Sequence, residues 1–180
     1  MFARDQQTIP FIEQWERANR WFAKVEVAYR DGTHADEMMD LFFVTFQNLF
    51  CLRDWFLSSG LDKDKVNTLF SKKNLRLCRD IANGTKHCAI SRASVDANFR
   101  TFREYDPTVV KIGFARVEVF RVHAHSQTYD MYGLLQNCFT DVQEFLIQEG
   151  LLAARSALKC DMMAAASFNP NTILGKVDCA

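Results

Sequence analysis

Residues 38–57 read MMDLFFVTFQNLFCLRDWFL, and this is the most hydrophobic stretch of the chain. If the stretch is helical, apolar side chains occupy most of its circumference, so we expect neighbouring helices to cover it on more than one side. Its longest run without a charged residue is the twelve residues Leu41–Leu52, whereas a membrane-spanning helix needs about 20 mainly apolar residues. The stretch therefore predicts a core helix of a bundle and no membrane anchor.

The composition of the whole chain favours the same interpretation. The 180 residues include 16 Phe but only 7 Gly and 3 Pro, so aromatic volume is high and helix-breaking residues are few. A chain of this length suits one domain. We expect residues 1–150 to form a single helical bundle, with residues 151–180 as a C-terminal helix or tail.

The six cysteines show no C-x-x-C spacing and no zinc-type pairing with histidine. Cys51, Cys78 and Cys138 fall among apolar residues of predicted helices, where a thiol behaves as a small hydrophobic side chain. The first ten residues contain Arg4 and Asp5 rather than an apolar leader. We therefore expect a cytoplasmic protein with reduced thiols.

Helical periodicity continues on both sides of residues 38–57. Apolar residues recur at steps of three and four, and capping sequences stand at Thr33–Asp36 and at Asp62. The predicted helices cover residues 11–30, 36–58, 62–70, 74–87 and 129–149, with one more over 152–166 in the tail.

A different pattern precedes the last long helix. Residues 88–107 show no clear period, and we expect a connection there with one turn of helix near residues 98–103. Residues 108–122 are rich in β-branched and aromatic side chains, which predicts one or two strands. The predicted fold is therefore mainly α, a bundle of four to five helices with a small β insertion around residues 108–124.

The most informative helix is the one predicted over residues 74–87, NLRLCRDIANGTKH. On a helical wheel its polar residues gather within an arc of about 120°, opposite an apolar side. These polar residues are Arg76, Arg79, Asp80, Asn83, Lys86 and His87. A solvated surface is the simplest interpretation, because an amphipathic helix has a polar face by construction. Gly84 favours a functional surface instead, since glycine inside a helix costs about 1 kcal/mol relative to alanine.

The chemistry of this polar face suits cleavage of RNA with the ribose 2′-hydroxyl as nucleophile and without a metal or cofactor. Histidine is the side chain that most often transfers protons in enzymes, which makes His87 the candidate general acid and base. Arg79 can hold a phosphate through two parallel hydrogen bonds. Asp80 or Asn83 would fix the tautomer of the imidazole. These four residues form the predicted catalytic set.

The arrangement resembles the HEPN superfamily, whose helical bundle carries Arg, a polar residue directly after it, and a downstream His on one helix. Arg79-Asp80 matches the first part of that motif and His87 matches the last. Seven residues separate Arg79 from His87 here, which is more than the family motif has. The string CRDIANGTKH is also similar to a signature of bacterial and phage HEPN-like proteins.

The resemblance implies a metal-independent RNase of a toxin–antitoxin, CRISPR or phage-defence system, or a non-catalytic relative that binds nucleotides. It also implies a homodimer, because two protomers of this superfamily usually bring their Arg/His helices together in a shared cleft. Residues 76–87 would then line the dimer interface.

The charge balance limits how the chain could bind nucleic acid. Lys plus Arg and Asp plus Glu both number 22, so the formal net charge is zero. Proteins that hold nucleic acid through bulk charge carry a basic surplus, and that class is excluded. A local site for RNA or a nucleotide stays compatible with the balance, and we expect Arg76 and Lys86 to bind the substrate there.

Two other functions stay open. One is a non-enzymatic module that binds a protein partner, as a regulatory or toxin-neutralising subunit would, through the same polar face or the aromatic residues of the second helix. The other is a metal-dependent enzyme, because His123 and His125 alternate in a predicted strand and would share one face. The spacing indicates no third ligand. Gly-rich phosphate loops, G-x-S-x-G and H-E-x-x-H are absent from the sequence.

Overall fold

The computed structural model describes residues 10–87, 92–105 and 118–152. Their helices and strands are, in chain order, α1 (Pro10–Asp31), α2 (Ala35–Ser58), α3 (Lys63–Phe70), α4 (Lys73–Gly84), β1 (Arg100–Tyr105), β2 (Glu118–Ala124), β3 (Gln127–Asp130) and α5 (Met131–Gln148). The prediction of a mainly α fold with a small β element is confirmed. The tail from residue 153 onward, with most of its predicted helix, lies outside the described residues, as does the predicted strand region over 108–117.

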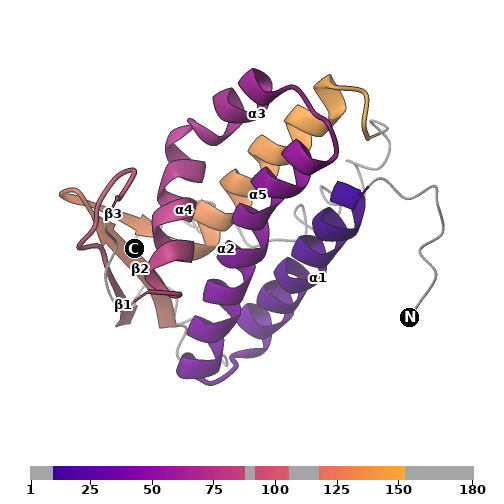
Figure 1. Ribbon diagram of the computed structural model, residues 1–180. Helices are drawn as coiled ribbons and strands as arrows, with labels where there is room; N and C mark the ends of the chain where they lie inside the picture. Colours follow the sequence, from indigo (N-terminus) through magenta and orange to yellow (C-terminus); the bar gives the residue numbers. More distant parts are fainter. Residues whose placement is uncertain (1–9, 88–91, 106–117, 153–180) are drawn as a thin grey trace, which may run out of the picture.

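Helix α2 is the centre of the bundle, and α1, α3, α4 and α5 all contact it (Figure 1). Phe42 and Phe56 of α2 have no exposed surface. The ring of Phe56 meets Phe11 of α1 at a centroid distance of 5.4 Å and Phe145 of α5 at 5.7 Å. Each buried phenyl ring stabilises the fold by about 1.5–3 kcal/mol relative to an exposed one. The predicted covering of α2 on more than one side is therefore confirmed.

The thiols inside the bundle pack as apolar groups. Cys78 and Cys138 have no exposed surface, and Cys51 is partly buried; all three are free. Burial raises the pKa of the Cys138 thiol, so the neutral form is favoured further. These three cysteines behave as the small hydrophobic side chains that the sequence predicts.

The helix caps agree with the sequence in one case and differ in another. Asp62 caps α3 as predicted, because its Oδ1 accepts the backbone N–H of Lys65 at 2.8 Å. The cap predicted at Thr33 is wrong, since α2 begins at Ala35 and His34 is its N-cap. Nδ1 of His34 accepts the N–H of Asp36 at 3.4 Å. The N–H of Thr33 instead donates to the carbonyl of Ala28 and closes the end of α1.

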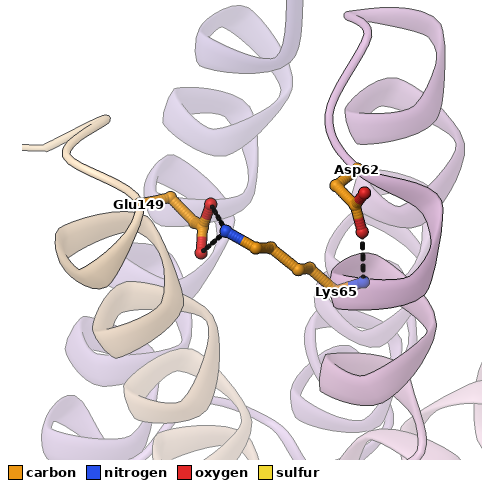
Figure 2. Close-up of polar contacts among 3 residues, drawn as sticks. All are labelled: Asp62, Lys65 and Glu149. Carbon is orange, nitrogen blue, oxygen red and sulfur yellow. Dashed lines mark hydrogen bonds and ion pairs between the residues drawn. The ribbon is translucent and has the colours of Figure 1, made fainter.

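An ion pair joins the start of α3 to the end of α5 (Figure 2). Nζ of Lys65 lies 3.0 Å from Oε1 and 2.8 Å from Oε2 of Glu149, so it contacts both carboxylate oxygens. This contact raises the pKa of the Lys65 ammonium, chiefly through the hydrogen bond to Glu149. The pair connects segments that lie 84 positions apart in the sequence.

The three strands form one antiparallel sheet in the order β1-β2-β3, and Figure 1 shows it beside α4. Phe120, Val122 and Ala124 of β2 are buried, and Phe120 contacts Phe42 of α2 at a centroid distance of 5.6 Å. The turn of helix predicted near residues 98–103 is wrong, because that segment is mostly strand β1. Strand β1 is exposed along most of its length. Its sequence therefore lacks the alternation of apolar and polar residues that predicts a strand.

Strand β3 also has no clear sequence signal. It is joined to β2 by His125 and Ser126, whose φ angles are 46° and 62°. A two-residue hairpin with two positive φ angles usually contains Asn-Gly or Asp-Gly. Because His-Ser occupies these positions, the sequence does not mark the hairpin.

Candidate functional site

The site predicted on the fourth helix lies at the boundary between the bundle and the sheet. The apolar side of α4 is buried as predicted. It consists of Leu75, Leu77, Cys78, Ile81 and Ala82. The helix ends at Gly84, three positions earlier than predicted, and His87 lies in the bend that follows. Gly84 is thus the last residue of α4, and the inference that it weakens the helix interior is wrong.

The end of α4 is anchored to α2. Nε2 of Gln47 donates to Oγ1 of Thr85 at 2.6 Å, and that hydroxyl donates to the carbonyl of Ala82 at 3.0 Å. The backbone N–H groups of Lys86 and His87 both donate to the carbonyl of Asn83, at 3.1 and 3.0 Å. The backbone that carries Lys86 and His87 is therefore held by several hydrogen bonds.

Asp80 differs most from its predicted position. Its side chain has no exposed surface, although the helical wheel places it on the polar face. Oδ1 accepts the N–H of Ser94 at 2.7 Å, while Oδ2 accepts the N–H groups of Val95 at 2.5 Å and Asp96 at 3.0 Å. A buried carboxylate is tolerated when donors surround it in this way. Asp80 therefore holds the loop of residues 92–99 against α4.

The same loop also contacts the β2–β3 turn. Arg76 donates from Nη2 to the carbonyl of Ser94. Oδ2 of Asp96 accepts the N–H of His125 at 2.8 Å, and its Oδ1 accepts the N–H of Asn98 at 2.8 Å. These donors lower the pKa of the Asp96 carboxyl, the N–H of His125 having the largest effect. One continuous set of contacts thus connects α4, the loop and the sheet.

Sequence reasoning missed the part that Ser94 and Asp96 play. Asp96 and Asn98 form an Asx-type contact, in which a side-chain oxygen accepts the N–H two residues later. That local pattern is the one signal in the sequence that could have marked the loop as ordered. The contact with Asp80 has no such signal, because its donors are backbone groups, which every residue type except proline carries.

Four predicted residues remain at the surface, and we refer to them as the α4 cation face. Its members are Arg76, Arg79, Lys86 and His87, all of them exposed. The side chains of Arg79, Lys86 and His87 form no hydrogen bond or ion pair with any residue in the described ranges. Asn83 lies between them in sequence and is partly buried. The acidic member of the predicted set, Asp80, lies beneath this surface.

Two neighbouring lysines are already occupied. Nζ of Lys72 lies 2.8 Å from Oδ1 of Asp141 on α5. Nζ of Lys73 donates to Oε1 of Gln127 at 2.8 Å and lies 5.3 Å from the centroid of the Tyr129 ring. Both lysines therefore attach α4 to its neighbours, and they are less available to a ligand than Arg79 or Lys86.

The two histidines of the sheet do not form a recognisable metal centre. Nδ1 of His123 lies 3.0 Å from Oγ1 of Thr128, and His125 belongs to the turn rather than to β2. Across residues 10–87, 92–105 and 118–152, no group of three His, Cys, Asp or Glu side chains is placed to hold a metal. None of the helices in those ranges combines the length and apolar content needed to cross a membrane.

The comparisons with known proteins found no match. No family model matches the chain, and neither the search of curated proteins nor the search of solved structures returned a similar one. The geometry around α4 is therefore the basis for assigning a function.

Proposed function

We propose that this protein is HEPN-like and that the α4 cation face is a site for RNA or a nucleotide. One observation carries this proposal: the carboxylate of Asp80 is buried and bound to three backbone N–H groups. The charged groups left exposed between Arg76 and His87 are then all cationic, namely Arg76, Arg79 and Lys86. Such a surface suits a phosphate group, and it is compatible with a chain of zero net charge.

Each member of the face would have a distinct part in binding. Arg79 presents a planar guanidinium that can contact two oxygens of one phosphate, and Lys86 adds a compact positive charge. Arg76 donates one hydrogen bond to the carbonyl of Ser94, which neutralises no charge. Its guanidinium has further donors for a ligand.

For cleavage, His87 would remove the proton from the ribose 2′-hydroxyl or deliver one to the leaving oxygen. Arg79 would stabilise the charge that develops on the phosphate. Asn83 is the better candidate for orienting the imidazole, because both oxygens of Asp80 already accept backbone hydrogen bonds. In this form the protein is a metal-independent endoribonuclease of a defence or toxin–antitoxin system.

A shared cleft between two copies would place two cation faces opposite each other. Like charges at short distance repel, so this form of the homodimer should be strengthened by a polyanion that lies between the faces. We therefore expect RNA to promote the association of two copies through α4.

The deciding experiment incubates the protein with single-stranded RNA in the presence of EDTA and measures both binding and cleavage. Arg79→Gln should weaken binding about tenfold and lower the salt dependence by about one phosphate contact. His87→Asn should lower the cleavage rate about 10²–10⁴-fold while binding changes little.

The matched controls substitute an arginine and a histidine that lie outside the α4 cation face. Arg20→Gln removes an exposed cation of α1, and His125→Asn removes an exposed imidazole from the β2–β3 turn. Both controls should behave as the unmodified protein does. RNA binding that is absent, or that falls equally in the controls and in Arg79→Gln, would refute the proposed site.

The alternative is a non-enzymatic module that binds a protein partner, and it would use the same polar face of α4, because neighbouring helices cover the aromatic residues of α2. Phe42, Phe46 and Phe56 are fully buried, and Phe43 and Phe50 are partly buried. The exposed large hydrophobic side chains of the described residues lie on other elements.

A further inference from the structure

Strand β1 combines an open edge with exposed apolar surface. In the described part of the chain β1 pairs with β2 alone, so its other edge carries backbone groups that no described strand satisfies. Val27, Phe102 and Tyr105 are the exposed large hydrophobic residues of the described ranges, and two of these three lie on β1. An edge of this kind is a ready template for another strand.

The geometry of antiparallel pairing restricts how β1 could pair with a copy of itself. Two residues directly opposite each other turn their N–H and C=O groups either both toward the partner strand or both away. Since these directions alternate along a strand, a residue of β1 can face only a residue an even number of positions away. The two-fold axis must therefore pass through a residue and never between two residues.

Strand β1 has the sequence RTFREY, and its charged side chains favour one position of the two-fold axis. An axis through Phe102 places Arg100 opposite the partner's Glu104, Phe102 opposite its own copy, and Thr101 opposite the partner's Arg103. An axis through Arg103 would place that arginine opposite itself, which is destabilising. An axis through Thr101 would pair only the first three residues of β1. The axis through Phe102 pairs five residues and places no two like charges directly opposite.

The contacts already present in the sheet favour the same arrangement. Side chains alternate along a strand, so Arg100, Phe102 and Glu104 share one face of the sheet. Nε of Arg121 on β2 lies 3.4 Å from Oε2 of Glu104, and the Glu104 side chain is still 57% exposed. This carboxylate can therefore accept a second guanidinium from outside the sheet.

We propose that β1 is a homodimer contact, in which two copies pair their β1 strands antiparallel about Phe102 and form one continuous six-stranded sheet. Arg100 and Glu104 of each copy form two symmetric ion pairs, and the two Phe102 rings pack together at the axis. This contact depends on no residue of the α4 cation face, so the two proposals succeed or fail separately.

Charge reversal provides the test, with sedimentation equilibrium measuring the dimer dissociation constant. Arg100→Glu places Glu opposite Glu at both ends of the contact, and Glu104→Arg places Arg opposite Arg. Each variant should dimerise at least about tenfold more weakly than the unmodified chain, because two attractive cross-strand pairs become repulsive.

A mixture of the two variants gives a sharper result. The Arg100→Glu chain carries two acidic residues on this face and the Glu104→Arg chain carries two basic ones, so the mixture should form a heterodimer that neither variant forms as a homodimer. An unmodified chain that stays monomeric, or variants that self-associate like the unmodified chain, would overturn the β1 contact. Thermal unfolding of each variant shows whether Glu104→Arg, which brings a second guanidinium close to Arg121, disturbs the fold.

Cross-linking locates the axis independently. Phe102→Cys brings two copies of one residue opposite each other, at a Cα separation of about 4.5–5.5 Å that permits a disulfide. Thr101→Cys is the matched control, because residue 101 faces residue 103 of the partner rather than its own copy. Oxidation should cross-link the Phe102→Cys chain and leave the control uncross-linked; equal cross-linking of both would contradict the axis.

Discussion

The buried carboxylate of Asp80 on α4 accepts the backbone N–H of Ser94 at 2.7 Å across fourteen positions of sequence. Arg76, one turn earlier on the same helix, donates to the carbonyl of that serine. Ser94 is therefore held at both its N–H and its C=O by a single helix. This pairing makes the loop of residues 92–99 part of the bundle, and it removes the acidic member of the predicted site from the surface.

Replacement of Asp80 should destabilise the fold. Asp80→Ala leaves three backbone N–H groups without their acceptor, and we expect the free energy of unfolding to fall by about 2–4 kcal/mol. Asp80→Asn keeps the shape but directs N–H donors toward other donors, at a cost of about 1–3 kcal/mol. Urea denaturation measures both.

The control for Asp80 is Asp54→Asn, because the Asp54 side chain is 83% exposed. A surface substitution of this kind should change the unfolding free energy by no more than about 0.5 kcal/mol. If Asp80→Asn were equally mild, Asp80 would not be the anchor of the loop.

Acid should release the loop from the β2–β3 turn. The N–H groups of His125 and Asn98 lower the pKa of Asp96 below its usual 3.8. An acid with a lowered pKa in the folded state contributes stability above its unfolded pKa and loses it as the pH falls through the folded pKa. The protection factor of the His125 amide hydrogen, which compares its exchange with the intrinsic rate at the same pH, should therefore fall below pH 3.8. Asp96→Asn should remove this pH dependence, and an unchanged profile in that variant would assign the effect to another group.

Alkali should act where α1 meets the start of α5, because Tyr29 and Tyr132 stack there at a centroid distance of 5.0 Å. Burial raises the pKa of each phenol from 10.0 to about 12. For an acid whose pKa is raised by folding, stability is complete below the unfolded pKa and is lost as the pH rises through the folded pKa. We therefore expect the denaturation midpoint to decline between pH 10 and about 12.

Ultraviolet absorbance of the phenolate follows the two tyrosines directly. Tyr132→Phe should remove one of the two groups that titrate late and should make the decline of stability with pH shallower. The same titration in Tyr29→Phe provides the comparison. Phenols that all ionise together near pH 10 in the folded protein would contradict the partial burial of this pair.

The contact between Phe42 and Phe120 should connect the sheet to the bundle energetically. Phe42 has no exposed surface, and its ring lies 5.6 Å from that of Phe120. Phe42→Ala should lower the unfolding free energy by about 3–5 kcal/mol, through lost burial and the cavity left behind. Val27→Ala, at a position 47% exposed on α1, should change it by no more than about 0.5 kcal/mol. Comparable losses in both variants would contradict a core that centres on α2.

The local pattern of the sequence is sufficient to predict most of the helices. Helices α1, α2, α3 and α5 were all expected within a few residues of their observed bounds. Their apolar residues recur at helical steps over several turns, and the cap at Asp62 acts through its own neighbours. Strand β1 has no such signal. It forms by pairing its backbone with that of β2, and its alternate side chains are not buried.

For the candidate site too, local pattern predicts one part and tertiary contacts decide the rest. The sequence by itself determined a mainly α chain, a core built around residues 38–57, and a polar face on the fourth helix. Only the tertiary structure decided that Asp80 turns inward, that α4 ends before His87, and that Arg79 and Lys86 remain exposed. The physical reason is that periodicity reports which side of a helix is apolar, whereas the burial of a charge depends on donors that arrive from elsewhere in the chain. For Asp80 those donors are the N–H groups of Ser94, Val95 and Asp96, which the fold alone brings beneath α4.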